Sequence, residues 1–340
     1  MQEVIKVTSV IIGTIIGAGF ISGQEIYSFF NKYGEAGRIG IFVSILLLGF
    51  VIYKTYKITY ENKINNYEQL LDYIMKGTNK IIIYTIKNII NIFLIISFFI
   101  MCSAFSTYCA ETYGLPRIIG GIIISLLSFL ILIKDVKAII KTNEILMPAI
   151  IIFIIIMSVL TIKSFEFSTN SLQNVEKTIL SGILYANYNS IVLIPMLIGI
   201  KGQIKTKKQI NIVAIISFFV MLILTILIYE MQKGTNGNLE MPMLSIANGI
   251  SWQFLIIYGI MVGIAIFTSA ISAGYSLICN VAKGNKSKKL IALILCIIAI
   301  PISTISFSTL VNLLYPIFGL LGTLQIIFLI KSWKKRRLLI

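Results

Sequence analysis

One carboxylate stands near the end of the first apolar segment of the sequence. Glu25 closes the string GTIIGAGFISGQE, which covers residues 13–25 and contains four glycines. A carboxylate inside a membrane is energetically costly and usually functional. Glu25 could be an outer gate paired with a cation, a proton-coupling acid, or a direct contact for a cationic solute. The alternative is a partly hydrated residue near the membrane interface.

The glycines of this string indicate a weak helix. Each glycine costs a helix about 1 kcal/mol relative to alanine. Gly13 and Gly17 also form a G-x-x-x-G pair, which commonly lets two helices pack closely. The string therefore predicts either a break in the first span or a helix-packing face.

Two further segments place polar groups inside apolar runs. YANYNS has five polar-capable side chains in six positions, at Tyr185, Asn187, Tyr188, Asn189 and Ser190. AIFTSAIS carries Thr268, Ser269 and Ser272. Either segment could bind a ligand. The structural alternatives are a hydrogen-bonded helix contact for the first, and bonding to the i−4 carbonyl or an interhelical contact for the second.

The composition predicts the elements that position these groups. Hydrophobic residues make up 57% of the chain and charged residues 12%, whereas a soluble domain carries about 25% charged residues. The sequence is that of a polytopic all-α membrane protein. It has no histidine, its four cysteines lie in apolar segments, and no glycine-rich phosphate loop stands beside a lysine. We therefore expect neither an enzyme nor a cofactor.

Apolar windows predict ten transmembrane helices in one domain over residues 1–340. Their approximate limits are 4–30, 38–58, 81–110, 117–134, 144–162, 175–200, 209–230, 251–281, 288–306 and 309–331. With the N-terminus inside, 23 of the 29 lysine and arginine residues lie in cytoplasmic segments and six lie outside. This bias predicts a multi-pass protein of the cell membrane with both termini cytoplasmic. The net charge of +16 then faces anionic lipid rather than nucleic acid.

The hydropathy divides the chain into two repeats of five spans, at about 4–162 and 175–331. Because five is odd, the second half enters the membrane from the opposite side, which is the arrangement of an inverted repeat. The two polar interruptions fall in the leading span of each half. We therefore expect helices 1 and 6 to be broken around a site at the membrane midplane.

Three strings carry a resemblance to a known family: GAGFISGQE, YANYNS and AIFTSAISAGY. Together they resemble the YkvI-like family of bacterial membrane proteins, from Met1 to about Trp333. That family is placed with the amino acid–polyamine–organocation superfamily, whose members share the LeuT-type 5+5 fold. The resemblance implies a solute transporter and selects no substrate.

The wider fold also implies a cation site. Sodium-coupled members hold one sodium ion between spans one and eight. Transferred to this sequence, the ligands would be the carbonyls of Gly13, Ile16 and Ala265 and the hydroxyls of Thr268 and Ser269. Neutral oxygen ligands suit a monovalent cation that binds and leaves repeatedly.

The same architecture implies a solute site beside the break. The amides after the break favour a carboxylate-bearing solute. The expected lining residues come from spans one, six and three: Ala18, Gly19, Phe20, Ser22, Gly23, Tyr185, Asn187, Tyr188, Asn189 and Tyr108. Gln24 and Glu25 are the expected coupling or gating residues.

The leading hypothesis is a secondary active transporter of a small solute, such as an amino acid, that works by alternating access with sodium coupling. One alternative is proton coupling through Glu25. Another is a sensor or receptor subunit of the same fold that binds a solute without moving it. The sequence selects neither the solute nor an oligomeric state.

Overall fold

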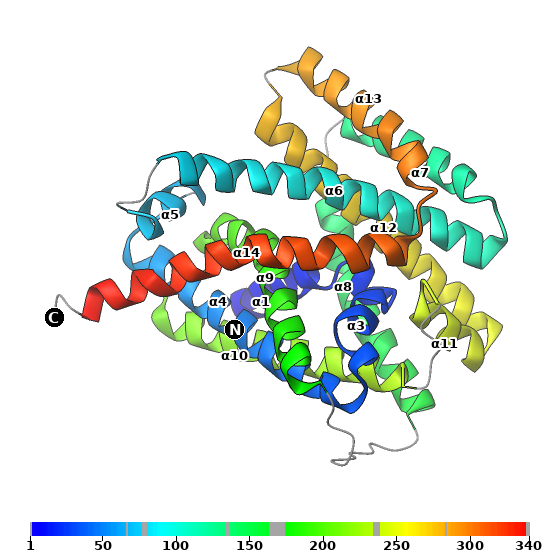
Figure 1. Cartoon of the computed structure of the whole chain (residues 1–340), viewed down its shortest axis with the longest axis horizontal. Coiled ribbons are helices and arrows are strands. Elements are labelled where there is room, and N and C mark those ends of the chain that lie inside the picture. The colour runs from blue at the N-terminus through cyan, green and yellow to red at the C-terminus, as the bar shows by residue number, and fades with distance from the viewer. Residues whose placement is uncertain are drawn as a thin grey trace.

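The chain folds into helices throughout the part that the structure describes. A computed structural model describes residues 2–65, 67–76, 80–133, 137–162, 174–233, 239–282 and 284–337, and these ranges contain no strand (Figure 1). The helices of the first half are α1 (Gln2–Ile15), α2 (Ala18–Ile21), α3 (Gln24–Phe29), η1 (Asn31–Ala36), α4 (Gly37–Glu61), α5 (Tyr67–Ile74), α6 (Lys80–Tyr113), α7 (Arg117–Leu132) and α8 (Lys137–Thr161). Those of the second half are α9 (Val175–Gly199), η3 (Lys201–Gln203), α10 (Lys207–Met231), α11 (Pro242–Ile250), α12 (Trp252–Val281), α13 (Asn285–Ile302) and α14 (Phe307–Arg337).

The helices are those of a multi-pass membrane protein. Within the described residues, six helices are long and apolar enough to cross a bilayer, and they cover Asn31–Glu61, Tyr84–Tyr113, Val175–Gly199, Lys207–Met231, Trp252–Val281 and Phe307–Lys331. Two shorter apolar helices cover Arg117–Leu132 and Leu146–Thr161. Each of the ten expected spans coincides with helical structure. By length and composition, however, the described residues show six candidate spans.

The first expected span is broken at two points. α1 ends at Ile15 and α2 begins at Ala18, so that Ile16 and Gly17 lie outside regular helix. A second break at Ser22 and Gly23 separates α2 from α3, and Gly23 has a φ of +83°. This left-handed conformation is accessible to glycine and strained for most other residues.

The expected break in helix 6 is wrong, because α9 is continuous from Val175 to Gly199. Four of its five polar side chains find hydrogen-bond partners without unwinding the backbone, and the Tyr185 hydroxyl has none among the described residues. Asn189 Nδ2 donates to the Tyr185 carbonyl at 3.0 Å, and Ser190 Oγ donates to the Asn187 carbonyl at 2.6 Å. The polar string is therefore a hydrogen-bonded helix contact, which the sequence pattern also allowed.

Contacts between helices give their relative directions. Ser181 Oγ donates to the Phe29 carbonyl at 2.7 Å, and Tyr188, further along α9, donates to Glu25. The first span and α9 therefore run antiparallel. Gly319 of α14 lies against residue 184 of α9, and Gly322 lies against residue 187. Because the residue numbers rise together along both helices, α9 and α14 run parallel.

α6 runs opposite to both α12 and α14. Ser103 of α6 donates to the Ile305 carbonyl at 2.7 Å, and the rings of Phe93 and Phe318 lie 4.7 Å apart. Tyr108 packs on Gly263 of α12, whereas Phe98 packs on residue 274. α12 consequently shares its direction with α14 and α9, and it runs antiparallel to the first span.

α4 and α9 approach so closely that their backbones touch. A Cβ atom on Gly182 would lie 2.4 Å from the carbonyl oxygen of Gly40. Small residues permit this kind of packing in membranes, where dispersion contacts and interhelical hydrogen bonds hold helices together.

Gly182→Ala should therefore destabilise the protein. The added methyl group meets backbone rather than a flexible side chain, so the helices must separate, at a cost of about 1–3 kcal/mol. Gly199→Ala is the matched control in the same helix, because nothing lies within 4 Å of its Cβ position. Thermal unfolding in detergent should show a lower midpoint for Gly182→Ala alone. Equal midpoints would contradict the close approach.

Candidate functional site

The first break leaves backbone groups without partners. The amide of Ile16 still donates to the Ile12 carbonyl at 2.7 Å, and regular bonding resumes where the Ile21 amide donates to the Gly17 carbonyl at 3.0 Å. Between these points, the structure gives no partner among the described residues to the carbonyls of residues 13 and 16 or to the amides of residues 18–20. The break therefore offers both acceptors and donors.

Open space reaches this break. No heavy atom lies within 4 Å of the position that a Cβ atom of Gly17 would take. Its neighbours Ile16 and Ala18 are buried, at 1% and 0% exposure. Gly17 itself is half-buried, so the packing of the first span is looser here than at its two neighbours.

The second break is closed by distant segments. Three successive carbonyls at this break, those of Ile21, Ser22 and Gly23, accept hydrogen bonds from α12, from α11 and from the residue after α10, in that order. The donors are Tyr258 Oη at 2.6 Å, the Met243 amide at 3.0 Å and Gln232 Nε2 at 2.9 Å, respectively. The outer end of the first span is thus held by protein.

Glu25 lies buried between the first span and α9. It is 4% exposed, and Tyr188 donates its hydroxyl hydrogen to Glu25 Oε2. The other oxygen lies against Gly19, where a Cβ atom would be only 2.2 Å from Oε1. No ion pair joins Glu25 to a lysine or arginine among the described residues. Glu25 is therefore not an outer gate ion pair in this conformation.

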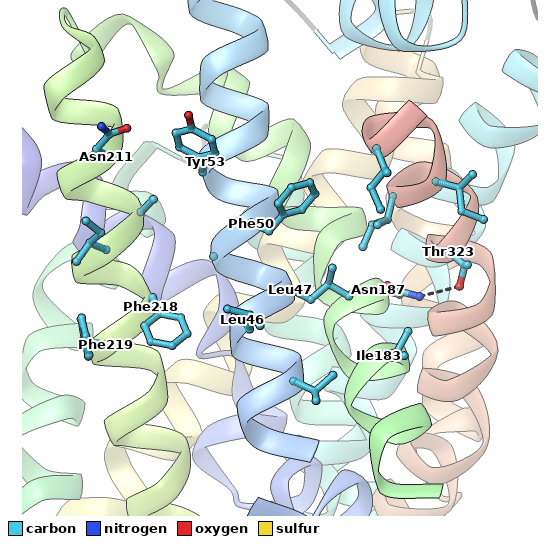
Figure 2. Close-up of a pocket in the computed structure, with 17 residues that line it drawn as sticks. Leu46, Leu47, Phe50, Tyr53, Ile183, Asn187, Asn211, Phe218, Phe219 and Thr323 are labelled. Atoms are coloured by element: carbon cyan, nitrogen blue, oxygen red, sulfur yellow. Dashed lines mark hydrogen bonds between the residues drawn. The ribbon is translucent and has the colours of Figure 1, made fainter. Parts of the chain in front are cut away.

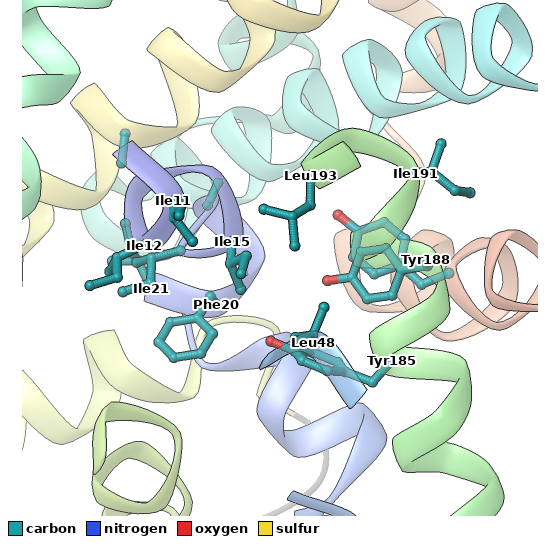
Figure 3. Packing of buried hydrophobic residues seen from close by; sticks show 14 of the residues in the cluster. Ile11, Ile12, Ile15, Phe20, Ile21, Leu48, Tyr185, Tyr188, Ile191 and Leu193 are labelled. Atoms are coloured by element: carbon teal, nitrogen blue, oxygen red, sulfur yellow. The ribbon is translucent and has the colours of Figure 1, made fainter. Parts of the chain in front are cut away.

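Aromatic rings surround the carboxylate. Tyr188 stacks between Phe29 and Tyr315, with ring centres 5.7 and 4.6 Å away. Tyr185 meets Tyr188 edge-on at 5.5 Å, and its fully buried hydroxyl has no partner among the described residues. Figure 3 shows the hydroxyls of Tyr185 and Tyr188 pointing from α9 toward the first span. The tyrosines and Glu25 form one polar cluster in an apolar core.

The structure thus brings together part of the expected solute site. Gly19, Glu25, Tyr185 and Tyr188 meet, and the remaining first-span residues lie in or directly after α2: Ala18, Phe20, Ser22 and Gly23. Ser22 Oγ donates to the Gly19 carbonyl at 3.0 Å.

Other expected residues lie elsewhere. Asn187 Nδ2 donates to Thr323 Oγ1 of α14 at 2.7 Å, and Asn189 bonds within its own helix. The Tyr108 hydroxyl lies 3.1 Å from that of Tyr113, and the Tyr108 ring packs on α12. In the amide orientation in which its oxygen accepts from Ser28 Oγ, Gln24 donates through its side-chain nitrogen to the carbonyls of residues 239 and 240, at 3.1 Å each. These contacts are structural in the present conformation.

The expected sodium ligands lie on two elements. The Thr268 hydroxyl donates to the Ala265 carbonyl at 3.1 Å within α12, and Ser269 is half-buried beside it. On the first span, a Cβ atom on Gly13 would lie 3.0 Å from Met147 of α8, and Ile16 lies at the break. The sodium site stays a prediction.

One acidic residue holds the segment that closes the second break. Glu240 forms an ion pair with Arg117, and its Oε2 accepts from Thr107 Oγ1 at 3.0 Å and from the Phe307 amide at 2.8 Å. It thereby ties the segment before α11 to α6, α7 and α14. Its partners are distant in sequence, so the pattern of residues gave no sign of this role.

The chain is similar over nearly its whole length to two proteins of Bacillus subtilis strain 168. It is 23% identical to the uncharacterized protein YyaD over 334 residues, which are 95% of this chain and 96% of that protein. It is 28% identical to the uncharacterized membrane protein YkvI over 325 residues, which are 91% and 90% of the two chains. No protein-family model matches the chain. The similarity agrees with a multi-pass membrane protein.

The contact between Gly19 and Glu25 can be tested by a double-mutant cycle. Gly19→Ala should displace the Glu25 side chain and lower the free energy of unfolding by about 1–3 kcal/mol. In a Glu25→Ala background the obstructing atoms are gone, so the same change should cost less. Thermal unfolding of the four proteins measures the coupling. Gly17→Ala is the control, and an additive cycle would contradict the contact.

Proposed function

We propose that this protein is a secondary active transporter of a small solute that works by alternating access in the cell membrane. The observation that carries the proposal is the break at Ile16 and Gly17, beside which the carbonyls of residues 13 and 16 and the amides of residues 18–20 have no hydrogen-bond partner among the described residues. Each unsatisfied backbone group costs several kcal/mol in hydrocarbon. Broken spanning helices are tolerated where water, ions, solute or protein satisfies those groups, as at the binding sites of transporters.

The directions of the helices support a ten-span inverted repeat. The leading elements of the two halves, the first span and α9, run antiparallel. α12 and α14 run with α9, whereas α6 runs with the first span. This is the alternation expected if ten spans form two oppositely oriented sets of five. The similarity to YkvI and YyaD supports placing the chain among YkvI-like proteins.

An amino acid or a related carboxylate fits the groups around the break. The amides of residues 18–20, which have no partner among the described residues, are donors for a carboxylate. The nearby carboxylate of Glu25 and the unpaired hydroxyl of Tyr185 are partners for an ammonium group. A zwitterionic solute would satisfy both sets. We propose sodium as the coupling ion, held by Gly13, Ile16, Ala265, Thr268 and Ser269.

A thermal-shift screen followed by uptake tests this function. Amino acids that bind the native protein should raise its midpoint in detergent, and sodium should increase the effect. In proteoliposomes, the best ligand should accumulate only with a sodium gradient. Thr268→Ala/Ser269→Ala should weaken sodium affinity by roughly tenfold per hydroxyl lost. Ser272→Ala, one turn further along α12, is the control.

Each failure of this experiment has a separate meaning. Binding without uptake or counterflow would favour a sensor or receptor subunit over a transporter. Uptake that is unchanged when choline replaces sodium would reject sodium coupling and leave the transporter in place.

The burial of Glu25 favours proton coupling as the second candidate. A buried carboxylate without a cationic partner must be neutralised, either by a proton or by a bound cation. Tyr188 supplies one hydrogen bond but no positive charge. A carboxylate that gains and loses a proton while it faces opposite sides in turn would couple transport to a proton gradient.

Glu25→Gln distinguishes the two coupling ions. If Glu25 carries the coupled proton, the variant should lose uncoupler-sensitive accumulation, while solute exchange across the vesicle continues. If sodium is coupled, accumulation driven by a sodium gradient should persist in a reduced form. Tyr188→Phe is the control, because it removes the hydrogen bond and keeps the carboxylate. Proton-driven accumulation by Glu25→Gln at the wild-type level would exclude Glu25 as the coupling acid.

A further inference from the structure

A large groove opens on the outside of the helix bundle, apart from the broken span. Its volume is about 1110 Å³, and it lies between α4 and α10 on one side and α9 and α14 on the other (Figure 2). Residues of all four helices line it, among them Leu46, Phe50, Tyr53, Phe218 and Ile327. The transport mechanism proposed above does not use this groove.

The groove is apolar and faces the bilayer. Exposed side chains stand along it, including Leu46, Ile215 and Phe219 at 54–55% exposure. At its floor, Asn187 Nδ2 donates a hydrogen bond to Thr323 Oγ1 (Figure 2). Because these walls are hydrocarbon, an occupant of the groove must bring an apolar body.

The length of the groove matches one leaflet. Along α4 the lining extends from Val43 to Tyr53, a rise of about 15 Å at about 1.5 Å per residue. The hydrocarbon core of a bilayer is about 30 Å thick, so half of it is about 15 Å. A lipid acyl chain of a single leaflet therefore has the length that the groove accommodates.

Two lysines extend the polar end of the groove. Lys57 lies one turn beyond Tyr53 on α4, and its Nζ donates to the Tyr53 hydroxyl at 3.1 Å. Lys208 lies one turn before Asn211, which lines the groove on α10. Residues three or four apart share a helix face, so both lysines continue the lining. Neither forms an ion pair among the described residues.

We propose that the groove binds an anionic phospholipid of the lysine-rich leaflet. Its acyl chains lie against the apolar walls of α4, α10 and α14, and its phosphate lies between Lys57 and Lys208. Basic residues at the ends of membrane helices attract anionic lipids by about 1 kcal/mol each, whereas the acyl chains alone do not distinguish head groups. The site therefore selects for charge at its polar end and for chain length along its walls.

Native mass spectrometry in detergent tests the lipid site. Phosphatidylglycerol and phosphatidylcholine with the same acyl chains are titrated onto the delipidated full-length protein. The wild-type protein should bind phosphatidylglycerol more tightly. Lys57→Gln/Lys208→Gln should lower that affinity by roughly thirtyfold, about fivefold per lysine, and leave phosphatidylcholine binding unchanged. Lys286→Gln/Lys289→Gln is the charge-matched control on exposed lysines of α13.

A second variant tests the apolar part of the site. Gly49 lines the groove, and a Cβ atom there would make an ordinary contact 3.5 Å from Phe218, so Gly49→Leu fills space without a clash at Cβ. It should lower the affinity for both lipids while the melting temperature stays close to that of the wild type. Equal affinities for the two lipids in the wild type, or wild-type lipid binding in both variants, would overturn the proposal. A protein dimer that binds no lipid would also overturn the proposal, because a second copy of the chain would then occupy the groove.

Discussion

The structure depends on one constraint, which is that a peptide group in an apolar environment needs a hydrogen-bond partner. In long helices such as α6 and α12, the peptide groups bond to one another within the helix. In the first span, the breaks interrupt this bonding. At its outer break, the carbonyls of residues 21–23 find partners on Gln232, Met243 and Tyr258. At its inner break, the carbonyls of residues 13 and 16 and the amides of residues 18–20 have none among the described residues. The same backbone defect is thus closed at one end and available to a ligand at the other.

Two glycines allow close approaches between the segments around this break. Gly19 has no side chain where the Glu25 carboxylate lies, and Gly182 has none where the backbone of Gly40 passes. The first contact gives the buried carboxylate room in the core, where it has no cationic partner among the described residues, and the second brings α4 and α9 together. Tyr188 extends from α9 to Glu25, so the helix that packs closely against α4 also carries the partner of the buried carboxylate.

The sequence was sufficient for the membrane class, the helical segments and the weakness of the first span, because these follow from local composition and glycine content. It failed for α9. Asn189 and Ser190 bond to backbone carbonyls of their own helix. The same residue types would also occur at a helix break, so the sequence pattern does not separate the two cases. It also could not reveal Met243, which acts through its amide, or Glu240, whose partners are distant in the chain. Such roles arise from tertiary contacts, which residue spacing does not encode.

The hydrogen bonds that close the second break have a consequence for how the first span is held. Hydrogen bonds hold the junction of α2 and α3 to the α10–α12 region, whereas α1 packs against α8, α9 and α10 through a buried apolar face. At its far end, α1 is joined to the α10 region by an ion pair between Glu3 and Lys205, whose side chains are 45% and 70% exposed. Exposed pairs contribute little to stability. α1 is therefore held in the bundle mainly by apolar packing, whereas the adjoining part of the first span is held by hydrogen bonds to its backbone.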